Sequence, residues 1–192
     1  IQLSPRYAEP YINRGSAYTE MGRYNAAIDD FTTAAELRPD AALPLVNRGI
    51  AYFRRQQYDR AIADFTQAIQ REPDAPKAYE ERGAAYLAQG RTDAAIEDFR
   101  AAIERGGDSA QVYGNLGVAH AQKGDYESAI DALTEAIERD SENPENYTNR
   151  GVAYAQKGDY RAAIRDFDRA VRVNPASAET YYNRAEAHRN YG

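Results

Sequence analysis

The same glycine returns every 34 residues along this chain. It occupies five positions with no insertion between them, Gly15, Gly49, Gly83, Gly117 and Gly151. A fixed period of this length is typical of solenoid proteins, in which each repeat packs on its neighbours and cannot bury its apolar face alone. The sequence therefore predicts a stack of small units in place of a globular domain with a central core.

Each copy of the repeat has the pattern of two helices joined by a turn. In the fifth copy, aromatic residues and an Arg-Gly pair precede a glycine turn, and alanine, phenylalanine and proline follow it: Tyr147, Arg150, Gly151, Tyr154, Gly158, Ala163, Phe167 and Pro175. This pattern resembles the tetratricopeptide repeat (TPR) family over essentially the whole chain. The resemblance implies an all-α fold, a right-handed superhelical solenoid of antiparallel helix pairs. The chain departs from the family pattern by having Arg in place of Leu and Tyr in place of Trp.

Alignment of the copies gives the expected division of a single TPR domain. Residues 1–7 are expected to end a preceding repeat and 178–192 to form the first helix of a sixth, with five full repeats at 8–41, 42–75, 76–109, 110–143 and 144–177. The first helices are expected near 8–21, 42–55, 76–89, 110–123 and 144–157, and the second helices near 24–37, 58–71, 92–105, 126–139 and 160–173. Because the chain begins and stops inside the pattern, we expect it to be a segment of a longer protein.

A helical projection of the fifth first helix, at about 100° per residue, separates its residues into two arcs. Arg150, Gly151 and Tyr154 lie near Tyr147 and are expected to pack on the second helix, where small residues let the two backbones approach closely. The second arc is expected to line a continuous surface, which in TPR proteins is the concave groove. It contains Glu145, Thr148, Asn149, Val152, Ala155 and Gln156.

The arginine on the packed arc needs a partner for its charge. In four copies an aspartate follows it sixteen residues later, giving the pairs Arg14 and Asp30, Arg48 and Asp64, Arg82 and Asp98, and Arg150 and Asp166. The fourth copy replaces both residues together, with Leu116 and Ala132. We therefore predict a partly buried ion pair between the two helices of one copy. The alternative is that the aspartate is only a solvated surface residue.

One slot on the groove arc holds asparagine in five copies, namely Asn13, Asn47, Asn115, Asn149 and Asn183, and Glu81 in the third copy. Amides at one phase of a superhelix offer paired donors and acceptors, which suit the backbone of an extended peptide. The array resembles the asparagine ladder in the TPR superhelix of O-GlcNAc transferase, a binding feature separate from that enzyme's catalytic part. The alternative is that these asparagines stabilise the backbone of a neighbouring helix.

Large apolar residues lie on the groove arc in the first three copies, namely Ile12, Val46, Ile50, Phe53 and Leu87. We predict that Phe53, with Ile50 and Val46, holds a hydrophobic side chain of a partner, because large apolar groups left in water commonly mark interaction sites. We expect Glu80 and Glu81 to favour a basic residue of the partner nearby. The alternative is that Phe53 packs on the adjacent helix. The slot after the leading aromatic contains no lysine, which disfavours binding of acidic chaperone tails.

Composition and charge exclude several classes of function. The net charge is -6 and the Lys and Arg residues form no cluster, which argues against nucleic acid as a partner. No apolar run is long enough for direct insertion into a membrane. The chain has no cysteine, so it has no disulfide or thiolate site, and a reducing, cytoplasmic location is favoured.

No catalytic, cofactor-binding or metal-binding residues are predicted. His120 and His188 occupy a slot that holds tyrosine in most other copies, which predicts packing roles, and neither has a second ligand at metal spacing.

The sequence as a whole favours a protein–protein interaction scaffold that binds a peptide or helix of a partner in the groove. One alternative is the recruiting arm of a larger enzyme. Another is a self-associating or engineered repeat array. It would stack head to tail through Ile1 and Leu3 at one end and Tyr181, Tyr182 and Tyr191 at the other.

Overall fold

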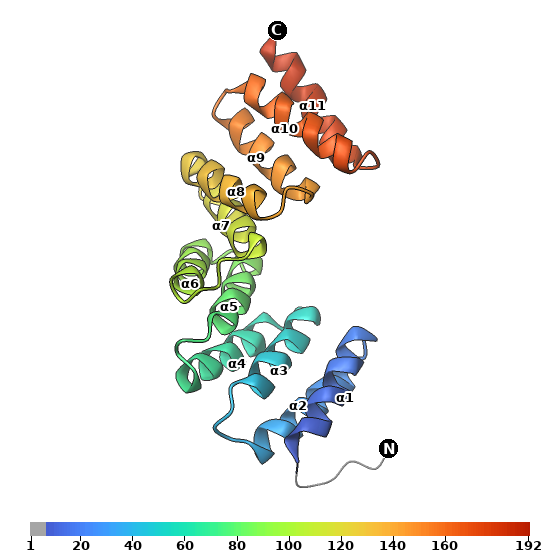
Figure 1. The fold of residues 1–192 in the computed structure, drawn as a ribbon, viewed down its shortest axis with the longest axis vertical. Helices are drawn as coiled ribbons and strands as arrows, with labels where there is room; N and C mark the ends of the chain where they lie inside the picture. Colours follow the sequence, from blue (N-terminus) through green and yellow to red (C-terminus); the bar gives the residue numbers. More distant parts are fainter. Residues whose placement is uncertain (1–6) are drawn as a thin grey trace. The chain divides into compact units, whose positions relative to one another are not determined.

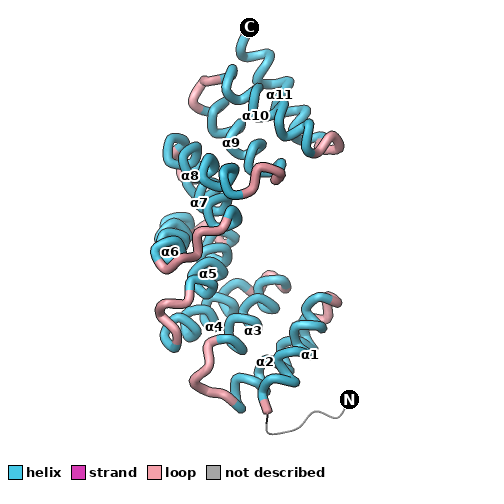
Figure 2. The backbone as a smooth tube through the Cα atoms, viewed as in Figure 1, coloured by secondary structure: helices cyan, strands magenta, loops and turns pink. Residues whose placement is uncertain are grey.

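The computed structural model describes residues 7–192, and within this range the chain forms eleven helices and no strand (Figures 1 and 2). The first helices of the repeats are α1 (Ala8–Glu20), α3 (Leu43–Arg54), α5 (Pro76–Ala88), α7 (Ala110–Gln122), α9 (Pro144–Gln156) and α11 (Ala178–Tyr191). The second helices are α2 (Tyr24–Leu37), α4 (Tyr58–Arg71), α6 (Thr92–Glu104), α8 (Tyr126–Arg139) and α10 (Tyr160–Val173).

The helices begin and end where the repeat pattern predicts, each within one residue. The prediction of an all-α fold is confirmed, because every described segment longer than a turn is helical. The predicted end of a preceding repeat, with Ile1 and Leu3, lies almost wholly outside the described residues. The division into repeats at the limits given above stays a prediction.

The chain divides into two compact units, one that ends at Gly107 and one that runs from Asp108 to Gly192. In the first unit, α1 to α6 pack in order as antiparallel pairs, and α1 and α5 each contact α3 as neighbouring first helices. In the second unit, α7 to α11 repeat this arrangement, and α9 contacts both α7 and α11. Within each unit, a first helix therefore packs on its own second helix, and α3, α5, α9 and α11 also pack on the preceding second helix.

In four of the five repeats, a phenylalanine on the second helix packs directly on the glycine of the first helix. Phe167 is 1% exposed, and a Cβ built on Gly151 would lie only 2.7 Å from Cε1 of its ring. The same contact recurs between Gly15 and Phe31, Gly49 and Phe65, and Gly83 and Phe99. The predicted close approach of the two helices is thus confirmed, and it explains why the repeat requires glycine at this position.

The ion pair predicted within four of the repeats is also confirmed. Arg150 donates from Nε and Nη2 to the two carboxylate oxygens of Asp166 at 2.8 and 2.9 Å. The equivalent two-bond pairs form between Arg14 and Asp30, Arg48 and Asp64, and Arg82 and Asp98. The Asp166 carboxylate raises the pKa of Arg150, so this guanidinium stays charged at every physiological pH.

Each of these arginines after the first also binds the second helix of the preceding repeat, which the sequence analysis did not predict. Nη1 of Arg150 donates to the Thr134 hydroxyl at 2.9 Å. Arg48 and Arg82 make the same bond to Thr32 and Thr66. In α11, Arg184 donates instead to Asp168, which occupies the threonine slot. One guanidinium therefore joins three helices of two consecutive repeats.

The fourth repeat builds the same packing from apolar residues. Leu116 and Ala132, which replace the arginine and aspartate, are both 7% exposed. Leu133 replaces the phenylalanine and is fully buried against Gly117. This repeat shows that the fold accepts either a complete ion pair or an apolar pair at these two positions.

The turn between the two helices of a repeat requires a left-handed backbone. Gly22, Gly90, Gly124 and Gly158 supply it with φ between 71° and 83°. In the second repeat Gln56 occupies this position at φ 59°, a region that residues with a Cβ adopt at a cost.

We expect Asp166→Ala to lower the free energy of unfolding by about 3 kcal/mol, because it leaves the charge of Arg150 buried without its partner. The matched control Asp131→Ala removes an exposed aspartate of α8 and should change stability by less than about 0.5 kcal/mol. Urea titrations followed by circular dichroism give both values. The double variant Arg150→Leu, Asp166→Ala, which copies the fourth repeat, should recover much of the loss. Equal effects of the two single variants would contradict the structural role of the ion pair.

Replacing Gln56 by glycine should stabilise the first unit by about 0.5 to 1 kcal/mol, because glycine adopts a positive φ without strain. The control Gln67→Gly lies at an exposed position inside α4. There, glycine should destabilise by about 1 kcal/mol. The urea midpoints of the two variants should therefore move in opposite directions, and a lower midpoint for Gln56→Gly would show that the turn is not strained.

Candidate functional site

Crevices between consecutive first helices are the candidate functional site. The crevice between α1 and α3 in the first unit contains a cavity of about 190 Å³. The crevice between α9 and α11 in the second unit contains two cavities, of about 350 and 260 Å³. We call these the α1–α3 crevice and the α9–α11 crevice.

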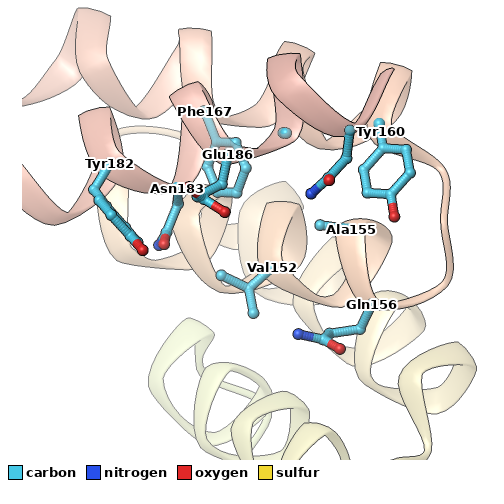
Figure 3. Close-up of a pocket in the computed structure, with 10 residues that line it drawn as sticks. Val152, Ala155, Gln156, Tyr160, Phe167, Tyr182, Asn183 and Glu186 are labelled. Atoms are coloured by element: carbon cyan, nitrogen blue, oxygen red, sulfur yellow. The ribbon is translucent and has the colours of Figure 1, made fainter. Parts of the chain in front are cut away.

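The larger cavity of the α9–α11 crevice lies toward the C-terminal ends of both helices. Figure 3 shows Asn183 and Glu186 of α11 pointing toward Val152 and Gln156 of α9, with Tyr182 beside them and Tyr160 at the other end. Phe167 and Ala187 close the cavity from within the core, and Ala155 and Asn190 complete its lining. The cavity thus combines an apolar base with amide, carboxylate and phenol groups at its mouth.

The smaller cavity of the α9–α11 crevice lies toward the N-terminal ends of the helices and is more polar. Its lining comprises Pro144, Glu145, Thr148, Asn149, Asn174, Ser177, Glu179 and Thr180. The six residues that the helical projection placed on the second arc of α9 all line one or other of the two cavities. The projection therefore identified which side of α9 faces α11.

The α1–α3 crevice joins polar and apolar groups in the first unit. Asn47 and Ile50 come from α3, Ser16, Thr19 and Glu20 from α1, and Phe31 forms its base. Helix α2 contributes Phe31 because its ring passes under Gly15, as described above. Two of the predicted partner-binding residues thus lie together in this crevice.

The predicted asparagine slot has different environments in different repeats. Asn47, Asn149 and Asn183 line cavities and are half-buried, whereas Asn13 is exposed. The side chains of these four residues make no hydrogen bond to any other described residue. Asn115 differs, because its Oδ1 accepts a bond from Gln111 at 3.0 Å. The alternative that the amides stabilise a neighbouring helix backbone therefore has no hydrogen bond to support it in residues 7–192.

The predicted apolar residues are more buried than we expected for a surface that is free to bind a partner. Val46 is 8% exposed and belongs to the core. Phe53 is half-buried and packs edge-on against Tyr58 of α4, with ring centroids 5.4 Å apart. Ile50 and Leu87 are half-buried. Of this group, Ile50 is the residue that lines a cavity.

Glu80 and Glu81, the acidic pair of α5, already have a cation beside them. Nζ of Lys77 lies 3.1 Å from Glu80 and 2.9 Å from Glu81. Burial opposes the charge of Lys77, but its bonds to Glu81 and Glu80 raise its pKa overall. A basic residue of a partner would therefore compete with Lys77 for these two carboxylates, and the expected contact stays a prediction.

The two histidines have different surroundings. His120 is buried, as its predicted packing role requires, and its Nδ1 lies 3.1 Å from the Asp125 carboxylate. Hydrogen bonds from Ser128 and the nearby His120 lower the pKa of Asp125, which caps α8. His188 is exposed in α11, the last described helix, and its predicted packing role stays a prediction.

One buried polar atom in the second unit has no hydrogen-bond partner, Nδ2 of Asn146. The amide of Asn146 fills the space beside Gly114, where a Cβ would lie 2.9 Å from its Oδ1. In the next repeat the equivalent residues, Thr180 and Thr148, hydrogen-bond to each other at 3.1 Å. Asn146 therefore belongs to the packing of α9 on α7 and not to the α9–α11 crevice.

Sequence reasoning predicted Asn183 but missed two other residues that α11 supplies to the site. Glu186 and Asn190 line the larger cavity but do not occupy the asparagine slot. They follow Asn183 by three and seven residues, so they lie on the same side of the helix. Extending the projection of α9 to α11 would have identified them.

The described residues contain no group of three or more potential ligands that could hold a metal ion. None of the helices between residues 7 and 192 is long and apolar enough to cross a membrane.

Comparison with protein families gives matches along most of the chain. A model described as "Tetratricopeptide repeat" matches residues 12–76, 46–110 and 81–144. A second model with that description matches residues 132–165, and one described as "TPR repeat" matches residues 152–192. Comparison with curated protein sequences gave no match.

Solved structures of similar fold include a chain of the APC/C hetero-tetramer Cut9-Hcn1, at 20% identity and a TM-score of 0.86. The match covers 96% of the present chain, which spans 36% of that neighbour. A further similar structure is MamA 41-end from Desulfovibrio magneticus RS-1, at 22% identity and a TM-score of 0.79, with 90% and 97% of the two chains covered.

Another similar structure is YrrB, described as a TPR protein with an unusual peptide-binding site, at 20% identity and a TM-score of 0.77. The match covers 94% of the present chain and 93% of the YrrB chain. At these identities the structural likeness establishes the fold alone. Together with the family matches, it confirms the resemblance seen in the sequence. The chain belongs to the tetratricopeptide repeat family, whose members are generally scaffolds for protein–protein interaction.

Proposed function

We propose that this chain binds a peptide segment of a partner protein in the crevices between its first helices. The observation that carries the proposal is the set of unpaired amides at the cavities, Asn47 in the first unit and Asn149 and Asn183 in the second. An amide offers both a donor and an acceptor, and a peptide backbone presents both in alternation. Such contacts hold a peptide without reading its side chains.

The dimensions of the α9–α11 crevice suit a short extended segment. At about 1.5 Å per residue, a helix of the length of α9 is roughly 20 Å long. An extended peptide advances about 3.3 Å per residue, so five or six residues cover this length. The two cavities of the crevice then give pockets for side chains of that segment.

Two other functions predict different behaviour. A self-associating or engineered array would grow in mass with concentration, and the exposed Tyr181, Tyr182 and Tyr191 of α11 offer a surface for it. The recruiting arm of a larger enzyme would bind its partner through the same crevices. This alternative differs from the proposed function only in that an enzyme domain is joined to the arm. Peptide binding by this chain itself is therefore the property to measure first.

We expect a display library of random peptides to yield peptides that bind the wild-type chain. Their affinity for the double variant Asn149→Ala, Asn183→Ala should be about tenfold lower, because two hydrogen bonds to the peptide are lost. Fluorescence polarisation measures this affinity, and circular dichroism checks that the helices remain. The control Asn25→Ala, Gln67→Ala removes two exposed amides from second helices and should leave binding unchanged.

Equal affinity of the asparagine variant and the wild type would contradict a role for the amides. Failure to select any peptide, together with growth of mass in light scattering, would instead favour self-association.

A further inference from the structure

We infer that the α9–α11 crevice selects peptide segments that carry two cationic side chains, lysine or arginine, separated by two residues. The inference rests on the proposed peptide binding and adds the chemistry of the ligand. It starts from the charges that line the two cavities of this crevice.

Every charged side chain that lines the α9–α11 crevice is a carboxylate. Glu186 is the charged residue of the larger cavity, and Glu145 and Glu179 are those of the smaller one. The arginines nearest in sequence on the two helices already have carboxylate partners, Asp166 for Arg150 and Asp168 for Arg184. A ligand in this crevice therefore meets negative charge at both cavities, which favours a cationic ligand.

The spacing of the carboxylates on α11 sets the spacing of the cations. Glu179 and Glu186 are seven residues apart, so they lie on nearly the same side of the helix, about 10.5 Å apart along its axis. In the polyproline II form of an extended peptide, three residues make one full turn and cover about 9 Å, so side chains three positions apart lie on the same face. Side chains at the first and fourth positions of such a peptide therefore reach the two cavities together.

The larger cavity has the other features of a cation-binding pocket. The rings of Tyr160 and Tyr182 border it, and an aromatic face attracts a cation in addition to the carboxylate. Gln156 and Asn183 supply amide oxygens that accept hydrogen bonds from an ammonium or guanidinium group. The apolar base formed by Val152 and Phe167 suits the aliphatic stem of lysine or arginine.

An internal cation competes at one end of the crevice. Arg189 donates a hydrogen bond to Glu186 from the next turn of α11. The side chain of Arg189 is 71% exposed, and exposed pairs of this kind hold weakly, so a ligand cation can displace it. Glu145 and Glu179 form no ion pair within residues 7–192. The acidic pair of α5 differs, because Lys77 neutralises it.

The peptide selection described above tests the inference directly. Selected peptides should be enriched in lysine or arginine at positions separated by two residues. A lysine peptide from the selection should bind about fivefold more tightly than its counterpart with glutamine at both positions. The variant Glu179→Gln, Glu186→Gln should lose this preference, and added salt should weaken the wild-type complex.

The control variant Asp131→Asn, Glu138→Gln removes the same charge at the same seven-residue spacing from exposed positions of α8. It should keep the preference, because α8 does not line the crevice. An equal loss of the preference for lysine peptides in both variants would show that this preference depends only on the net charge of the chain, and it would overturn the inference.

Selected peptides that lack basic residues, yet depend on Asn149 and Asn183, would also overturn the inference while supporting the proposed function. If no peptide is selected at all, both fail.

Discussion

The arginine in the slot where the TPR pattern has leucine organises the packing of this protein. It lies beside the glycine at which the two helices of a repeat come closest, and it binds the aspartate of its own second helix with two hydrogen bonds. Its third bond reaches the preceding second helix. A buried charge is tolerated only when its hydrogen bonds are satisfied. The positions of three helices are therefore fixed relative to one guanidinium group.

The same packing explains why the first helices have a side that is turned away from the second helices and is free for the proposed binding. Because the Arg, Gly and Tyr residues on one side of α1 and α9 pack on second helices, another side of each packs on the next first helix, α3 or α11. Contact between first helices is limited, and the space left over becomes the crevices. Unpaired amides such as Asn149 remain at the edges of this space. The polar groups of the proposed binding site are therefore not the ones that hold the helices together.

The sequence predicted the fold almost completely, because the period of 34 residues fixes each helix and proline and glycine mark its ends. It also predicted the partner of Arg150, since Leu116 and Ala132 replace both members of the pair together. The bond from Arg150 to Thr134 was not predicted, because threonine at that slot is absent from the third and fifth repeats.

The candidate site was predicted less well for a physical reason. A helical projection shows which side of a helix is exposed, but not how deeply a neighbour covers each side chain. Val46 and Ile50 both appeared to face the groove, yet Val46 is buried and Ile50 lines a cavity. The pairing of Lys77 with Glu81 likewise depends on where the two side chains point, which the projection of the groove residues does not show.

The double replacement in the fourth repeat has a consequence for how such a chain changes over generations. An arginine and aspartate can become leucine and alanine only through an intermediate that has lost one partner. Loss of the aspartate leaves a buried charge, and loss of the arginine leaves a buried carboxylate, so both intermediates are disfavoured. Each repeat should therefore inherit one complete pair or the other as a unit, and mixed copies should be short-lived in any lineage that retains the fold.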